Sequence, residues 1–265
     1  MSATAAWRKS VVSHFPDSLP PLDCHAHIAT DVTAKQIDAL DAAVVLAVTR
    51  TPSETRIAIG RNDSTLIWGS GVHPAMKSAL QEFDPGEFRS SLRDLLFIGE
   101  VGLDRRGDLA LQRDVFSQVM AIATDQHVLI SIHSAGRAKE VLDLLSEYPH
   151  PGAILHWFMG DAEQLSRAIE LDHYFSVNAA MPTSTLEAIP RNRLLPETDF
   201  PASTRSTRAR KPGDIRALES RLSALPTFAG TDIRRMFWQN FRTIATRAGV
   251  LERLPENVFD VLIGA

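Results

Sequence analysis

The sequence predicts an α/β protein with the (β/α)8 TIM-barrel fold, and three observations support this prediction. The chain has 265 residues, enough for one large barrel domain. Eight short runs rich in Val, Ile and Leu alternate with helical patterns, as expected for strands that are covered on both faces. Reactive side chains stand where several runs end, which is where barrels carry functional groups. The predicted strands lie near Leu22–His25, Ala43–Val48, Leu66–Gly71, Leu95–Glu100, Val128–His133, Ala153–His156, Tyr174–Val177 and Arg193–Glu197.

The segments between these runs carry apolar residues at three- and four-residue spacing, which is typical of amphipathic helices. Ala110–Ala123 is the clearest case, and Ala138–Leu145 and Ala162–Ile169 repeat the pattern. Two further helical patterns, Asp214–Leu225 and Asp232–Ala248, would cover the closing side of the barrel. A doubly wound open sheet remains the structural alternative, because it also alternates strands with helices.

Composition indicates an ordinary globular chain without a linker, so we expect a lead-in over residues 1–20 and one barrel domain over residues 21–265. The turn-rich basic segment Pro201–Gly213 is expected to be a mobile loop. The net charge of −4 gives no overall basic surface, so any contact with nucleic acid must be local. A single cysteine excludes an internal disulfide, and no apolar run is long enough to span a bilayer. We therefore expect a cytoplasmic protein without membrane contact.

Histidines and carboxylates cluster at the predicted strand ends. Asp23, His25 and His27 alternate along the first strand, so they share one face and form three potential ligands directed to one point. A lone buried histidine is usually structural, but four histidines and two acids at strand ends are hard to explain by coincidence. The further strand-end residues are His73, Glu100, His133, His156, Glu197 and Asp199.

This arrangement predicts two neighbouring divalent metal ions. Mixed imidazole and carboxylate ligands suit Zn²⁺ or Mn²⁺, and Mg²⁺ is not excluded. Two such ions polarise a phosphoryl oxygen and lower the pKa of water, so hydrolysis is the predicted reaction class. The expected ligands are His25, His27 and Asp199 for one ion, His133 and His156 for the other, and Glu100 as the bridge.

Several motifs resemble the TatD family of metal-dependent deoxyribonucleases. They are, in family order, DCHAHI, GVHP, IGEVGLD, ISIHS, ILHWFMGD and ETDFP. The resemblance implies a TIM barrel, hydrolysis of DNA at ends or in single strands, and ligand roles for the six residues above. It also places His73 beside a substrate phosphate. It places Asp104 either near the metals or where it orients a metal ligand, with a loop cap as the alternative. The wider text, notably AVTRTPSETR and YFSVNAAM, resembles the TatD-like subunit of Qat anti-phage systems, which implies other subunits of a Qat-type defence complex as partners.

The chain also departs from the family pattern, and these departures concern substrate contacts. Many members carry an arginine two residues after the strand-five histidine, where this chain has Ala135 and places Arg137 two residues later. Arg105 follows the GLD motif, and Arg205 lies in the basic segment after Asp199. We expect both of these arginines, with His73 and Arg137, to bind substrate phosphates, although solvated surface positions remain an alternative for each arginine.

The leading functional hypothesis is a metal-dependent deoxyribonuclease in which Glu100 and Asp199 are catalytic and Asp199 helps to move the proton. Two alternatives stay open. The same barrel and ligands support hydrolysis of an amide, a lactone or the amino group of a nucleobase. The chain is also compatible with a partner-dependent subunit of a defence complex that has weak catalysis. Trp157 follows His156 directly, and it either stacks on a base at the mouth of the site or packs into the core.

Overall fold

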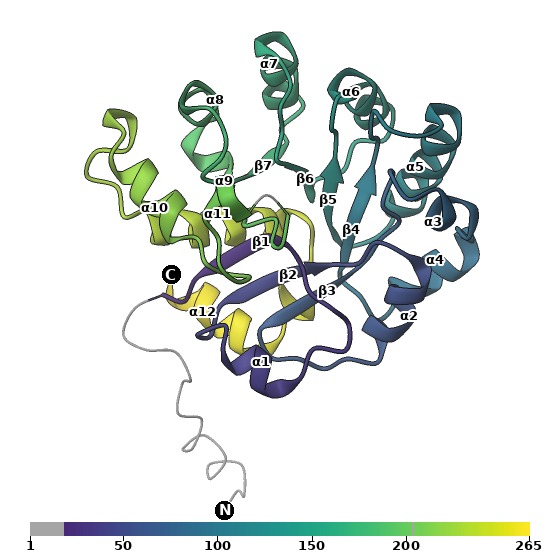
Figure 1. The fold of residues 1–265 in the computed structure, drawn as a ribbon, viewed down its shortest axis with the longest axis horizontal. Coiled ribbons are helices and arrows are strands. Elements are labelled where there is room, and N and C mark those ends of the chain that lie inside the picture. Colours follow the sequence, from purple (N-terminus) through teal and green to yellow (C-terminus); the bar gives the residue numbers. More distant parts are fainter. Residues whose placement is uncertain (1–18, 203) are drawn as a thin grey trace, which may run out of the picture.

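The computed structural model describes residues 19–202 and 204–265, so residues 1–18 of the expected lead-in lie outside the described residues. The described chain forms eight parallel strands in sequence order, surrounded by helices (Figure 1), which confirms the predicted fold class. None of the described helices combines the length and apolar character needed to cross a membrane. The strands are β1 (Leu22–His27), β2 (Val44–Val48), β3 (Leu66–Ser70), β4 (Phe97–Gly102), β5 (Leu129–His133), β6 (Ala153–His156), β7 (Tyr174–Val177) and β8 (Leu194–Pro196).

The helices lie outside the strands, as the alternation of patterns predicts. Polar side chains fix several of their starts: Asp108 accepts hydrogen bonds from the first turn of α5, and Asp161 forms a capping box with Gln164 at α7. The α-helices are α1 (Ala34–Asp38), α2 (Pro52–Ile59), α3 (Lys77–Gln81), α4 (Pro85–Ser91), α5 (Leu109–Ala123), α6 (Ala138–Glu147), α7 (Ala162–Glu170), α8 (Thr183–Ala188), α9 (Thr204–Thr207), α10 (Arg216–Ser223), α11 (Ile233–Arg247) and α12 (Glu256–Gly264). Short 3-10 helices are η1 (Arg191–Arg193), η2 (Pro226–Phe228) and η3 (Leu251–Arg253).

Backbone hydrogen bonds join the last strand region to the first and exclude the open-sheet alternative. The Asp199 N–H donates to the His25 carbonyl at 2.9 Å, and the His27 N–H donates to the Phe200 carbonyl at 2.8 Å. Pro196, which cannot donate to a ladder, is the last residue of β8. Closure therefore occurs just beyond β8, and it brings Asp199 beside the two histidines of β1.

Two strands carry an extra residue against their neighbour, and both irregularities lie next to candidate site residues. The pairing of β1 with β2 shifts between Asp23 and Ala26, around His25. The pairing of β4 with β5 shifts between Ile98 and Val101, around Glu100. A bulge of this kind bends the strand and changes the direction of a side chain, and such bulges are frequent beside active sites.

The basic segment Pro201–Gly213 is more structured than the sequence indicates, because it contains the short helix α9. Its end is attached to the body of the barrel. Lys211 donates to the Asp41 carboxylate and to the Ala39 carbonyl, both at 2.5 Å. The Gly213 N–H donates to the carboxylate of Asp23 at 2.8 Å, which anchors the loop at the foot of the site.

Candidate metal centre

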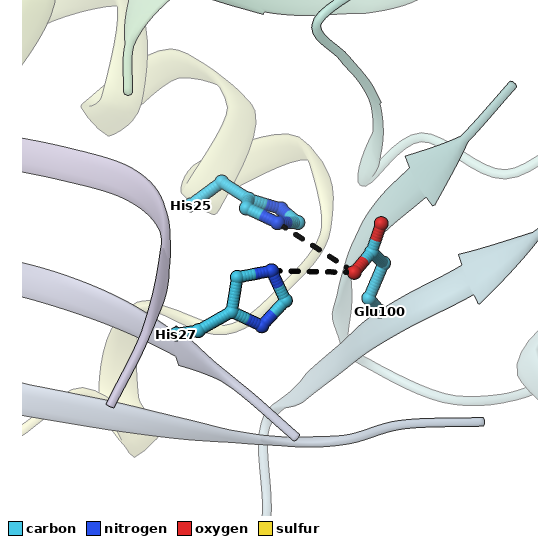
Figure 2. Close-up of side chains that lie close together, drawn as sticks. All are labelled: His25, His27 and Glu100. Carbon is cyan, nitrogen blue, oxygen red and sulfur yellow. Dashed lines mark ion pairs between the residues drawn. The ribbon is translucent and has the colours of Figure 1, made fainter. Parts of the chain in front are cut away.

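Histidines and carboxylates from six strands converge at the carboxyl-terminal mouth of the barrel. Figure 2 shows three of them: the rings of His25 and His27 point from β1 toward the carboxylate of Glu100 on β4. The structure thus brings together the side chains that sequence spacing selected. They are His25, His27, His73, Glu100, His133, His156 and Asp199.

The distances within this cluster match ligand spacing around a cation. His27 Nε2 lies 3.5 Å from Glu100 Oε2 and 3.4 Å from Asp199 Oδ1. His25 Nε2 lies 3.9 Å and 3.7 Å from the same two oxygens. Ligand atoms about 2.1 Å from a tetrahedral cation are separated by about 3.4 Å. His25, His27 and Glu100 therefore lie close enough together to hold one divalent ion, and so do His25, His156 and Asp199.

Three buried polar atoms of the cluster residues have no hydrogen-bond partner among the described atoms: Nδ1 of His27, Nε2 of His25 and Oε2 of Glu100. The last two atoms face each other in Figure 2. Both side chains are almost completely buried. Buried polar atoms are normally paired, and an unpaired one in a native structure calls for an explanation such as a missing ion. The residues present therefore fit a cation by their chemistry as well as by their spacing.

The hydrogen-bond partners of the ring nitrogens show which histidines can ligate a cation and which can donate a hydrogen bond. His25 Nδ1 lies 2.7 Å from Ser131 Oγ, and His156 Nδ1 lies 2.8 Å from Glu197 Oε2. With Nδ1 protonated, each ring turns the lone pair of Nε2 toward the cluster, which is the usual outer arrangement at metal sites. In His73 the Ala75 N–H donates to Nδ1 at 3.1 Å, so Nε2 carries the proton of the neutral ring, and this atom lies 3.3 Å from Glu100 Oε2 without forming a hydrogen bond to it. His73 is thus arranged to donate a hydrogen bond.

Both ring nitrogens of His133 lie within hydrogen-bond distance of a carboxylate. Its Nδ1 lies 2.6 Å from Glu100 Oε1 and its Nε2 lies 2.8 Å from Asp104 Oδ2. Arg106 in turn forms a forked pair with Asp104, with Nε 2.9 Å and Nη2 2.8 Å from its carboxylate oxygens. His133 would have to give up one carboxylate contact to ligate an ion. Asp104 therefore orients a site histidine, the second of the two positions that the resemblance allows.

Burial and charge oppose each other in this cluster. Burial lowers the pKa of His25 well below its usual value. Burial alone would also lower the pKa of His156, but the charge and hydrogen bond of Glu197, together with the charges of Asp199 and Glu100, outweigh burial and raise this pKa to about 10. Burial alone would raise the pKa of Glu100, but the surrounding histidines hold it well below its usual range. The lowered pKa keeps the Glu100 carboxylate charged, so it favours positive partners such as a metal cation.

Strand alternation groups Asp23 with His25 and His27 as a potential ligand, and the structure corrects this grouping. Its carboxylate accepts hydrogen bonds from the Thr198 hydroxyl at 2.6 Å, the Thr198 N–H at 2.9 Å and the Gly213 N–H at 2.8 Å. It does not face the cluster, because the bulge in β1 interrupts the alternation that grouped it with the histidines. Asp23 ties β1 to the segment that carries Asp199.

Glu197 and Ser131 complete the centre, although sequence reasoning gave neither a role. Glu197 is buried and also accepts from Ser176 Oγ at 2.5 Å and from Asn178 Nδ2 at 2.8 Å. The two-residue period of a strand would have pointed to both residues. Ser131 stands two residues before His133, and Glu197 stands two residues before Asp199, so the two side chains of each pair are expected on the same face.

The four predicted substrate-binding residues differ in whether they contact the cluster. His73 is part of it. Arg105 is exposed and packs over the loop after β5, since a Cβ at Gly136 would lie 3.0 Å from its own Cβ. Arg137 donates to Glu140 at 3.0 Å on α6. Arg205 is exposed on α9. Of the four, the described contacts join His73 alone directly to Glu100.

Comparisons with known proteins agree with this geometry. A family model described as TatD related DNase matches residues 22–246. The chain is 28% identical over 206 residues to the uncharacterized metal-dependent hydrolase YabD of Bacillus subtilis, covering 69% of this chain and 80% of YabD. It is 26% identical over 179 residues to the 3'-5' ssDNA/RNA exonuclease TatD of Enterobacter lignolyticus, covering 62% of this chain and 69% of that one. Among solved structures, the TatD homologue YjjV of Escherichia coli superposes with a TM-score of 0.70 at 18% identity, covering 84% of this chain and 97% of YjjV.

Proposed function

The chain belongs to the TatD related DNase family of metal-dependent hydrolases, and from this premise we propose that it hydrolyses phosphodiester bonds of DNA, at ends or in single strands. The observation that carries the proposal is the facing pair of unpartnered, buried ligand atoms on His25 and Glu100. The relative from Enterobacter lignolyticus, named an exonuclease of ssDNA and RNA, supports a nucleic-acid substrate.

Two divalent ions, Mg²⁺, Mn²⁺ or Zn²⁺, are part of this proposal. One would be held by His25, His27 and Asp199, the other by His133 and His156, with Glu100 between them. The second group requires His133 to release a carboxylate, as described above. Such ions polarise the phosphoryl oxygen, lower the pKa of water and stabilise the leaving oxygen.

The residues of the chain supply orientation and proton movement. The carboxylate of Asp199 stands at the mouth, where its side chain is 10% exposed, and it would accept a proton from the attacking water. His73 presents a ring N–H and would donate it to a phosphate oxygen. Arg105, Arg137 and Arg205 would contact further phosphates, and Arg137 must exchange its bond to Glu140 to do so.

A basic pocket on the loops after β7 and β8 supports a polyanionic substrate. Arg208 and Arg221 line a pocket of about 400 Å³ together with Ser206 and Ser220. Arg221 donates to two neutral acceptors, the Ala179 carbonyl at 2.6 Å and the Thr183 hydroxyl at 2.7 Å, so these bonds leave its charge unneutralised. Loops after the seventh and eighth strands are frequent phosphate sites in barrels of this type.

The proposal is tested with purified protein, Mn²⁺ or Mg²⁺, and end-labelled single-stranded DNA. We expect shortening of the labelled strand that stops on chelation and in Glu100→Ala. Glu82→Ala, which removes an exposed glutamate at the end of α3 that is not a member of the cluster, should retain full activity. Cleavage that survives both chelation and Glu100→Ala would refute the metal-dependent mechanism. Hydrolysis of amide or nucleobase substrates with intact DNA would instead assign the reaction to another bond.

We further propose that the chain acts in the cytoplasm as the TatD-like subunit of a Qat-type anti-phage system, with other subunits as partners. The support is the sequence resemblance in AVTRTPSETR and YFSVNAAM. Hydrolysis would then be required for protection. Full protection by Asp199→Asn in a phage-challenge assay would show instead that the chain contributes as a scaffold.

A further inference from the structure

A pocket of about 220 Å³ opens directly beside the metal centre. One side of it is formed by His133, His156 and Asp199, which all belong to the cluster. A phosphate held at the cluster would therefore place its neighbouring chemical group in this pocket. The properties of the other walls determine what that group can be.

The remaining walls are mainly apolar and include Trp157 and Met159. The two aromatic residues that follow His156 differ in exposure. Phe158 is completely buried and packs edge-to-face on Phe175, whereas Trp157 is partly exposed. Met159 is 70% exposed, which makes it one of the few exposed large apolar side chains among the described residues. An aromatic ring and a flexible thioether at the rim of a pocket suit a flat, apolar ligand.

The backbone holds Trp157 in a conformation that a bulky residue rarely adopts, with φ of 38°. Such strain persists where the surrounding structure fixes it, and it concentrates at functional sites. Here the Trp157 N–H donates to the Ser176 carbonyl at 3.2 Å, and the Ser176 hydroxyl binds Glu197, the partner of His156. The backbone of Trp157 is thus joined to the same strand residue, Ser176, whose hydroxyl belongs to the network that orients a site histidine.

The pocket lining lacks the positive side chain that a phosphate would need. Ala135 lines the pocket at the position where the family resemblance leads one to expect an arginine. The displaced Arg137 pairs with Glu140 on α6. No lysine or arginine lines this pocket among residues 19–202 and 204–265. The small side chain of Ala135 adds no charge to the pocket.

We propose that this pocket is a nucleobase subsite, in which Trp157 and Met159 hold the base of the nucleotide whose phosphate lies at the metal centre. The inference rests on the proposed function, because it assumes a nucleotide substrate. Stacking on an aromatic face is tolerant of base identity, so the subsite would favour nucleotides over other phosphodiesters without selecting one base.

The test compares two ligands that share a phosphate and differ in the base. Binding of thymidine 5′-monophosphate and of 2-deoxyribose 5-phosphate to the Mn²⁺-loaded protein is measured by calorimetry. We expect the nucleotide to bind about 5- to 100-fold more tightly, the range of one base–aromatic stack. Trp157→Ala should remove most of this preference, and Trp157→Phe should keep most of it. Ile57→Ala, which truncates an exposed apolar residue on α2, should change nothing.

A second variant leaves the indole in place. Ala135→Arg fills the pocket and adds a positive charge, so it should weaken nucleotide binding and strengthen binding of the sugar phosphate. Equal affinity of the native protein for both ligands overturns the base subsite, even if the protein degrades DNA. Preference for the nucleotide in a protein that cleaves no DNA would keep the subsite and refute the nuclease proposal.

Discussion

Buried histidines occur at both ends of the barrel, and the two groups are built in opposite ways. At the carboxyl ends of the strands, the rings face carboxylates: Glu100 for His27 and Glu197 for His156. At the amino ends, the rings of His150 and His173 precede β6 and β7. His150 contacts only backbone groups, with Nδ1 3.1 Å from the Gly152 nitrogen and Nε2 3.2 Å from the Gln126 carbonyl. A histidine is therefore informative through its strand end and its partner, and much less through its burial.

The largest expected effect comes from replacing one histidine at each end. His27→Ala removes a predicted ligand, so bound metal and hydrolytic rate should both fall by at least about 100-fold, beyond the loss expected for an outer partner. His150→Ala removes two backbone contacts, so it should lower the free energy of unfolding by about 2 kcal/mol.

Elemental analysis, rate measurement and urea unfolding of both variants check this prediction. His150→Ala should retain native metal content per folded molecule. Loss of metal in that variant alone would reverse the roles that we assign to the two ends.

The second prediction concerns the pH dependence of stability that arises from His173 at the amino-terminal end of the barrel. Burial lowers the pKa of His173 to about 4, whereas the unfolded chain titrates near its usual value of 6.5. The unfolded chain thus binds the proton first as the pH falls. The stabilising contribution of neutral His173 is complete above about pH 6.5 and is lost toward pH 4, a change of about 3 kcal/mol.

Urea unfolding of the native protein and of His173→Gln between pH 7 and pH 4 measures this contribution. Stability of the variant should fall less steeply over that range, because the variant lacks the titrating ring. Parallel curves for the two proteins would show that His173 is not the group responsible.

The smallest expected effect tests the partner rather than the ligand. Glu197→Gln keeps the size of the side chain but weakens its hold on His156, so metal affinity should fall about 10- to 100-fold. Competition with a chromophoric chelator measures that affinity directly. Glu252→Gln, in η3, provides a control that should bind metal as the native protein does. An unchanged affinity in Glu197→Gln would limit Glu197 to packing.

The sequence predicts the barrel and the positions of the cluster because both follow from strand ends. Apolar runs locate the strands, and barrel topology brings their carboxyl ends to one mouth. The sequence does not predict which side chains form hydrogen bonds or ion pairs with one another. Asp23 shares the alternation of His25 and His27 but turns to Thr198, because one extra residue in β1 changes its direction. A bulge depends on pairing with the neighbouring strand and has no local signature here.

The sequence also does not predict the contacts that long side chains make. Arg137 follows the strand-five motif closely enough to suggest a phosphate contact, yet its guanidinium binds Glu140. The basic segment after Asp199 contains a helical turn and an anchor at Lys211, neither of which its composition indicates. Such pairings depend on the three-dimensional neighbourhood, since one flexible side chain can reach several partners.

The two hydrogen bonds that join Asp199 and Phe200 to β1 also have a consequence for biosynthesis. A chain still being translated can present His25 and His27 as soon as its first strand emerges from the ribosome. It has no Asp199 until about three quarters of the protein has been made. A nascent chain is therefore unable to assemble the full proposed cation site, and we expect hydrolytic capacity to arise only after the whole ring of strands has left the exit tunnel.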